Sequence, residues 1–394
     1  MQNTKPFKSV LLFMLMLIFL LSSTGCVKNA TSLSKLSEGE YLVAFSRAFS
    51  KPARLVIYQG DDTKLEDIYV KDGQALGDSV KSEDGYLFVS QRINTHYLID
   101  RAGNITPVSF AADKYTPDRH GGTFFTVYSQ GWLISAMNIG SPPPGYACEL
   151  IIQKGLDGPQ KYLSLNLGIL DTAVVNGNIL YVHYLVVDSL DPDSVNFGRY
   201  AGIYAYDLTT GQEIFDVAIT NRSLASLVGK PITTYHNYIL LYGDSTDNPF
   251  EAQPPCLGVF DTISYKLIRE VYFDGSFLPA SLNIYQDKIY LMSADGKMKV
   301  LDSNFDTVQE YQLADNALEN YSDREPFIGK TILQGSELHV VYRFSPQQQN
   351  YQLPASIHVY DVETGKLKRV TDLKLEGETS WWAEYFDVQL ITNK

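Results

Sequence analysis

The sequence predicts an all-β fold made of seven repeated units, each a four-stranded antiparallel sheet. Three observations predict it. An apolar strand that ends in Asp recurs along the chain, a second strand rich in β-branched and aromatic residues precedes each copy, and no stretch beyond the N-terminal segment keeps a helical apolar period. One such sheet cannot bury both of its faces, whereas sheets stacked radially can, so the predicted architecture is a seven-bladed β-propeller.

The recurring strand is clearest in five segments, YLID, YAYD, GVFD, KVLD and HVYD, which end at Asp100, Asp207, Asp261, Asp302 and Asp361. Gln59 and Gln153 hold the same place in LVIYQG and ELIIQKG. The seven copies lie about 40 to 60 residues apart, near the length of one propeller blade. Because two copies are degenerate, six and eight blades stay open as alternatives. Each repeated Asp is expected to accept backbone N–H bonds in the turn that follows it.

The strands before each copy complete the predicted blade. Examples are YILLYG (238–243), KIYLMS (288–293) and LHVVYR (338–343), preceded by turn segments such as IYQDK. Turn residues between alternating strands predict hairpins, and two hairpins give four strands, here named A to D.

The two ends of the chain are expected to complete one blade together. The first unit starts at YLVAFSR, and no A strand is apparent before Tyr41. The last unit ends near Leu373 and leaves the strand EYFDVQLI (384–391) over. We expect this C-terminal strand to complete the first blade, because ring closure removes the open edges of the sheets.

The turn between strands C and D carries a family resemblance. YDVETGK (360–366) and YDLTTGQ (206–212) resemble the repeats of the PQQ-like (quinoprotein-like) propeller superfamily and the C–D hairpin of WD40 repeats, over about residues 41–391. The resemblance implies a propeller that docks proteins in envelope assembly and holds no cofactor. Phe215 and Val370 stand where PQQ-type repeats usually have Trp, and adjacent cysteines are missing. We therefore expect no cofactor.

The N-terminus is expected to be a targeting segment. Lys5 and Lys8 precede an apolar run, and the run ends in SSTGC. Small residues directly before Cys26 resemble the lipobox of bacterial lipoproteins, although Ser23 stands where the family usually has Leu. The resemblance implies a signal peptide over 1–25 and lipid on Cys26. An ordinary secretory signal and an uncleaved anchor are the alternatives.

The expected domain organisation follows from this segment. Residues 26–40 are predicted to be the lipidated Cys and a polar tether, and residues 41–394 a single propeller domain. The protein is then extracytoplasmic and held to the bacterial membrane by its N-terminal lipid, because two or more acyl chains anchor stably.

The charge of the chain excludes one class of partner. The formal net charge is −13, and loss of Lys5 and Lys8 with the signal would leave −15. Nucleic-acid binding needs clustered Lys and Arg, so we expect no nucleic-acid partner. We expect a monomer.

The loops between strands B and C supply the candidate binding surface. These loops are short in blades 2 and 6 but long at 137–148, 186–202, 243–256 and 344–355. Long loops on a rigid scaffold are where binding concentrates. Their aromatic and charged residues suit a peptide, a glycan or a cationic partner, and tolerated surface insertions are the alternative. The candidate rim consists of Tyr146, Asp188, Asp191, Asp193, Phe197, Arg199, Tyr200, Asp244, Asp247, Phe250 and Glu251.

Metal and thiol chemistry are weakly indicated. The acidic runs DSLDPDSVNFG and GDSTDNPFE do not match a calcium-binding EF-hand loop, so no metal site is predicted, with calcium as the alternative. Cys148 and Cys256 occupy equivalent places two blades apart, which should be too distant for a disulfide. We therefore expect two free or buried thiols, with a disulfide formed through the Pro-rich loops as the alternative.

Three functional hypotheses follow. The first is a binding or scaffold lipoprotein whose partner is an envelope protein or a wall polymer. The second is an extracellular enzyme, either a quinoprotein-like oxidoreductase or a carbohydrate-active hydrolase or lyase, although the common catalytic motifs are missing. The histidine expected to face the central funnel is His120, beside Asp118 and Arg119, and His236 borders an inner strand. The third is a sensor domain for a small ligand.

Overall fold

The structure is a computed structural model, and it describes most of the 394-residue chain. The described residues are 30–49, 52–110, 122–138, 148–165, 167–187, 199–219, 221, 223–225, 232–243, 254–314, 326–344, 353–375 and 384–391.

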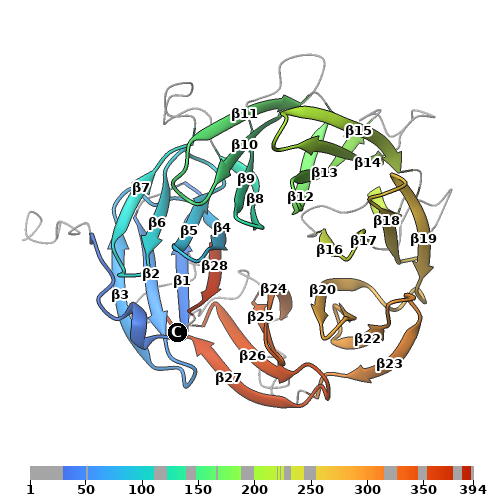
Figure 1. Ribbon diagram of the computed structural model, residues 1–394. Coiled ribbons are helices and arrows are strands. Elements are labelled where there is room, and N and C mark those ends of the chain that lie inside the picture. The colour runs from blue at the N-terminus through green and yellow to red at the C-terminus, as the bar shows by residue number, and fades with distance from the viewer. Residues whose placement is uncertain are drawn as a thin grey trace, which may run out of the picture.

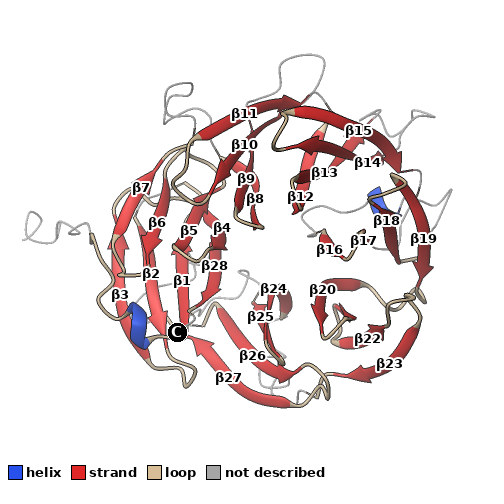
Figure 2. Ribbon diagram, viewed as in Figure 1, coloured by secondary structure: helices blue, strands red, loops and turns tan. Residues whose placement is uncertain are grey.

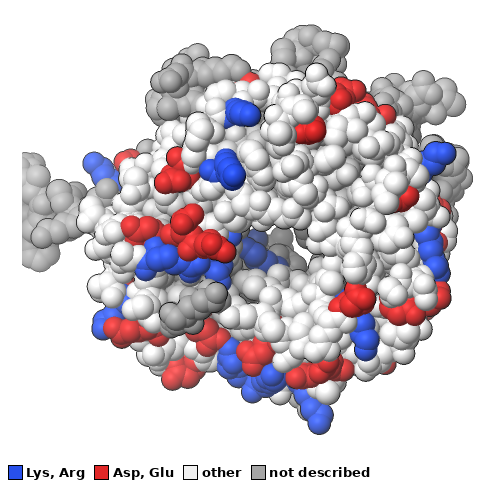
Figure 3. Space-filling view, in the orientation of Figure 1, with Lys and Arg blue, Asp and Glu red and all other residues white. Residues whose placement is uncertain are grey.

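Twenty-eight strands in these residues form seven four-stranded antiparallel sheets, arranged in a ring (Figure 1). The space-filling view shows an opening at the centre of the ring, called the channel below (Figure 3). Strand A of each blade lies innermost and strand D outermost. In A-to-D order, blade 1 contains β28 (Tyr385–Leu390), β1 (Tyr41–Ser46), β2 (Ala53–Tyr58) and β3 (Lys64–Val70). Blade 2 contains β4 (Leu76–Lys81), β5 (Gly85–Ser90), β6 (His96–Asp100) and β7 (Ile105–Val108). Blade 3 contains β8 (Thr123–Ser129), β9 (Trp132–Asn138), β10 (Cys148–Lys154) and β11 (Gln160–Leu165).

The other four blades repeat this order. Blade 4 contains β12 (Ile169–Asn176), β13 (Ile179–Val187), β14 (Arg199–Asp207) and β15 (Gln212–Ile219). Blade 5 contains β16 (Thr233–Tyr235), β17 (Tyr238–Gly243), β18 (Cys256–Asp261) and β19 (Lys266–Tyr272). Blade 6 contains β20 (Pro279–Tyr285), β21 (Lys288–Ser293), β22 (Lys297–Leu301) and β23 (Thr307–Gln312). Blade 7 contains β24 (Phe327–Gln334), β25 (Glu337–Arg343), β26 (Ala355–Asp361) and β27 (Leu367–Leu373).

This strand order confirms the predicted fold class, including seven blades and the ring closure. The C-terminal strand β28 pairs antiparallel with β1, from Tyr41↔Leu390 to Ser46↔Tyr385. The described helical segments are two short 3-10 turns, η1 (Leu36–Glu38) and η2 (Ser223–Ala225), so this part of the chain is almost wholly β (Figure 2). In the described residues, no helix has the length and apolar character needed to cross a membrane.

The hydrophobic core lies between neighbouring blades rather than at the centre of the ring. One cluster joins Tyr41 and Val43 of β1 to Ile357 and Val359 of β26, and comparable clusters join the other blades. Strands B and C supply most of this core because both of their faces meet another sheet, whereas the outermost D strands remain partly exposed. The packing is the radial stacking that the repeats predict.

Residues 30–40, which belong to the expected polar tether over 26–40, contact blades 1 and 2. Leu33 and Leu36 are buried against blades 1 and 2. The Leu33 backbone N–H donates to the Gly103 carbonyl at 2.8 Å, and Ser32 forms a bridge with Asn104. Two leucines three residues apart let an otherwise polar segment bury one apolar side against these blades.

Candidate functional site

The predicted rim falls almost entirely outside the described residues. This is true of Tyr146, Asp188, Asp191, Asp193, Phe197, Asp244, Asp247, Phe250 and Glu251, and also of Cys26 and His120. Arg199 and Tyr200 are the first two residues of β14, and their backbones pair with Val187 and Val186 of β13.

The strands that precede and follow the rim loops of blades 4 and 5 form continuous hairpins. The β13–β14 hairpin is paired without interruption from Ile179↔Asp207 to Val187↔Arg199, and β17 pairs with β18 as far as Gly243↔Cys256. The long B–C connections of blades 4 and 5 therefore start from the ends of continuous hairpins in neighbouring blades. Such hairpins are a rigid base for loops.

The repeated Asp residues bond to the turn that follows each C strand. Asp207 Oδ1 accepts the backbone N–H groups of Thr209 and Thr210 at 2.7 and 2.9 Å. Asp361 Oδ1 accepts the backbone N–H of Thr364 at 3.0 Å, and Asp100, Asp261 and Asp302 accept equivalent bonds. Hydrogen bonds to Thr364 hold the pKa of Asp361 below its ordinary value, and those to Thr209 and Thr210 do so for Asp207.

A polar cluster that the sequence did not reveal lies on the innermost strands, where β28 meets β4 and β24. Asp387 on β28 accepts the Ser79 hydroxyl at 2.5 Å and the Lys330 ammonium at 3.0 and 2.8 Å. The Gln389 amide donates to the Ser79 carbonyl at 2.9 Å and to its hydroxyl at 2.8 Å. Basic surface is visible within the central opening (Figure 3). Three blades thus meet through a mixed-charge group beside the channel.

Asp78 extends this cluster to a fourth blade. Its Oδ2 accepts the backbone N–H of Thr126 on β8 at 2.8 Å. Burial and the nearby charge of Asp387 raise the pKa of Asp78 to about 7, although Lys330 acts in the opposite direction. A carboxyl group with such a pKa changes its charge near neutral pH.

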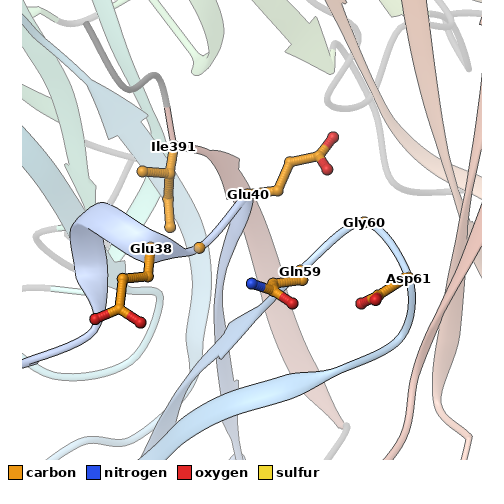
Figure 4. A pocket seen from close by; sticks show the side chains of 7 residues that line it. Glu38, Glu40, Gln59, Gly60, Asp61 and Ile391 are labelled. Atoms are coloured by element: carbon orange, nitrogen blue, oxygen red, sulfur yellow. The ribbon is translucent and has the colours of Figure 1, made fainter.

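A shallow hollow of about 500 Å³ lies at the start of β1 and the β2–β3 turn, beside Ile391 (Figure 4). Its three carboxyl groups already have partners. Glu38 pairs with Lys35 at 2.7 Å, Glu40 with Arg369, and Asp61 accepts the Thr63 backbone N–H at 3.2 Å. The three acidic side chains of this hollow are therefore accounted for by contacts within the chain.

The histidines of the described strands are buried rather than gathered at a site. His96, His183, His339 and His358 each have no more than 1% of their surface exposed. His96 lies in blade 2 and His183 in blade 4, whereas His339 and His358 lie on the paired strands β25 and β26 of blade 7. Desolvation lowers the pKa of His96 to about 3 and that of His339 to about 4, so both are neutral at physiological pH. His236 is different, since it lies in the exposed turn after β16 and contacts Asp287 at 2.6 Å.

The two described cysteines are free and buried, as predicted. Within the part of the chain that the structure describes, no three His, Cys, Asp or Glu side chains come together to hold a metal ion.

Comparisons with known proteins were made at three levels. Neither the models of known protein families nor the curated proteins match this sequence. Among solved structures, BamB from Moraxella catarrhalis is similar over 76% of this chain and 76% of its own, with 11% identity and a TM-score of 0.45. Apo AztD from Citrobacter koseri is similar over 90% and 99%, with 12% identity and a TM-score of 0.48. The WD40 domain of Neurospora crassa Pan2 is similar over 75% and 85%, with 12% identity and a TM-score of 0.47. Likeness at this level carries no inference about a partner or a substrate, and the propeller fold rests on the strand order of the seven sheets.

Proposed function

We propose that this protein is an extracytoplasmic β-propeller lipoprotein that binds an envelope protein or a wall polymer through the B–C loops of blades 3, 4 and 5. One observation carries the proposal: the ring is closed and regular, but the connections between strands B and C differ greatly in length from blade to blade. The B–C connection of blade 6 spans 294–296, whereas those of blades 4 and 5 span 188–198 and 244–255. These connections are aromatic and acidic, and Arg199 at the start of β14 adds a basic group, a composition that suits recognition of a polar partner.

The experiment for the binding surface is a crosslinking capture from membranes of the native cell, with the full lipidated chain as bait. In one variant the connections 188–198 and 244–253 are each replaced by a short Gly-Ser turn. A matched control shortens 345–352 in blade 7, which lies outside the proposed rim. The proposal expects a specific partner that the rim variant loses and the control retains. Equal capture by all three chains contradicts it.

The membrane anchor needs its own experiment, because the rim could bind a partner in a secreted protein as well. Cys26→Ala is expected to abolish incorporation of a labelled fatty acid and to move the protein from the membrane fraction to the soluble one. Cys148→Ala is the matched control and is expected to keep both. Unchanged labelling of Cys26→Ala would contradict lipidation, and membrane retention without any label would favour an uncleaved anchor.

The described residues support the carbohydrate-hydrolase alternative less well than the binding function. Asp78 and Asp387 lie on β4 and β28, the innermost strands of two blades that contact each other, and Asp387 is bound by Ser79 and Lys330. Glycoside hydrolysis uses two carboxyl groups that flank the sugar bond, with room for substrate or water between them. The observed arrangement ties one carboxylate into the wall of the channel, so the binding function is the better supported of the two.

A further inference from the structure

The residues before the first blade lie against the outside of the ring. The Ala30 backbone N–H donates to the Tyr69 carbonyl of β3 at 3.1 Å, and the Thr31 carbonyl accepts the Ile105 N–H of β7 at 2.8 Å. β3 and β7 are the outermost strands of blades 1 and 2 (Figure 1). Residues 30–38, called the N-terminal strap below, therefore hold the chain at the outer junction of these two blades.

Side chains hold the N-terminal strap in the same place. The Glu66 carboxylate on β3 accepts the backbone N–H groups of Ser34 and Lys35 at 3.1 and 2.8 Å. Leu33 and Leu36 are 1% and 4% exposed, and they belong to the core cluster that blades 1 and 2 share. Backbone, carboxylate and apolar contacts therefore all bind the strap to the same two blades.

The chain between Cys26 and the N-terminal strap is short. Ala30 follows Cys26 by four residues, and four fully extended residues span at most about 14 Å. A lipid on Cys26 holds that residue at the bilayer surface. This lipid is part of the proposed function, and the present inference rests on it. The outer junction of blades 1 and 2 is then kept within about 14 Å of the bilayer.

The proposed rim belongs to the opposite side of the ring. Blade 5 lies across the ring from the junction of blades 1 and 2, and blade 4 is next to it (Figure 1). The B–C connections of these two blades carry carboxylates and no Lys or Arg over 188–198 and 244–255. The carboxylates are Asp188, Asp191, Asp193, Asp244, Asp247 and Glu251. A bilayer that contains anionic lipids repels them, so this repulsion and the tether at the far edge act in the same direction.

We propose that the outer junction of blades 1 and 2 is the membrane-facing surface of this protein. The ring stands on this edge, and blades 4 and 5 are held away from the bilayer. The lipid surface is the partner of the edge that carries the N-terminal strap, whereas the partner of the rim is met on the side of the ring far from the membrane.

The experiment measures energy transfer from a fluorophore on the protein to an acceptor dye on phospholipid headgroups. The lipidated full chain carries Cys148→Ala and Cys256→Ala, so that an introduced cysteine takes the fluorophore, and it is reconstituted on vesicles of phosphatidylethanolamine and phosphatidylglycerol. One chain is labelled at Thr106→Cys on β7, beside the strap, and a matched chain at Ile268→Cys on β19 of blade 5. Both side chains are exposed on outermost strands, so the label leaves the core unchanged.

Energy transfer should be high from position 106 and several-fold lower from position 268, because the width of the ring separates position 268 from the bilayer. A matched control inserts about 20 Gly and Ser residues between Lys28 and Asn29, which adds about 25 Å of mean reach without a change in the blades. The difference between the two positions should shrink in this control.

Failure of the anchor and failure of the orientation give different results. If fatty-acid labelling and vesicle flotation show no lipid on Cys26, the anchor of the proposed function fails and this inference falls with it. If the chain is lipidated but energy transfer from position 268 equals or exceeds that from position 106, the orientation alone is overturned. A difference that the inserted linker leaves unchanged also overturns the inference, because the short tether would then not set the orientation.

Discussion

The Tyr41 hydroxyl lies 2.9 Å from His339 Nδ1, although the two residues are 298 positions apart in the sequence. Tyr41 begins β1 in blade 1 and His339 lies in β25 of blade 7, so the bond crosses the boundary where the ring closes. Both side chains are buried, and the rings also meet edge to face at 5.8 Å.

Loss of this hydroxyl is predicted to weaken the closed ring. Tyr41→Phe leaves a buried imidazole nitrogen without its partner, and such a group costs about 1–3 kcal/mol of unfolding free energy. The measurement is urea unfolding of Tyr41→Phe, His339→Leu and the double variant. The double variant should lose less than the sum of the two single losses, and strictly additive losses would show that the two side chains are not coupled.

The buried histidines predict a loss of stability in acid. His96 has a pKa of about 3 and His339 of about 4 in the folded chain, against 6.5 when solvated. A base with a lowered pKa contributes stability that is present above pH 6.5 and falls as the pH drops toward the folded value, by up to about 1.4 kcal/mol per pH unit for each residue. Asp78 acts in the opposite direction between pH 3.8 and 7, so the two effects need separate variants.

The experiment compares the free energy of unfolding at pH 7, 5.5 and 4.5 for the wild type and His96→Gln. Gln keeps an acceptor for the Ser90 N–H, which His96 Nδ1 accepts at 3.0 Å. The variant should show a shallower decline with acid than the wild type. An identical decline in both proteins would mean that His96 titrates as it does in water.

Repeats and strand order could be predicted from the sequence because both depend on local patterns. The strand that ends at Asp361 is visible in HVYD, and the missing first strand implied the pairing of β28 with β1. The burial of Leu33 was missed because SLSKLSE is polar by composition, and the spacing of Leu33 and Leu36 was the one signal available.

The channel cluster was missed for a different reason. Asp387 and Ser79 are 308 residues apart, and the segments LGDSVK and YFDVQL read separately are ordinary strands. Which side chains meet at the channel depends on the register of strands from different blades, and the β4–β5 pairing contains an irregularity between Leu76 and Asp78. No local pattern encodes that register. An Asp within the predicted C-terminal strand EYFDVQLI was the signal that the sequence offered.

The turn of blade 7 predicts a small, local effect. Asp361→Ala removes the acceptor for the Thr364 N–H and hydroxyl, at 3.0 and 2.8 Å, and should cost about 1 kcal/mol of unfolding free energy. Asp361→Asn keeps an oxygen at the same place and should retain most of that stability, which denaturant unfolding can measure. If both variants lose the same unfolding free energy, the effect comes from the negative charge of Asp361 and its contact with Lys368 rather than from the hydrogen bonds of the turn.

The free thiols predict slow chemistry in the folded chain. Cys148 and Cys256 are at most 1% exposed, and desolvation, with a smaller contribution from Glu270, raises the pKa of Cys256 to about 12. Because the thiolate is the reactive form, neither thiol should react with an aromatic disulfide reagent until the propeller unfolds, and the reaction rate should follow the unfolding rate. Cys148→Ala and Cys256→Ala, each in a Cys26→Ala chain, should each release one equivalent in denaturant. In the Cys26→Ala chain, which keeps both cysteines, two equivalents should be released in denaturant. A disulfide between blades 3 and 5 would instead give no release from that chain until a reductant is added, and this result would contradict the prediction.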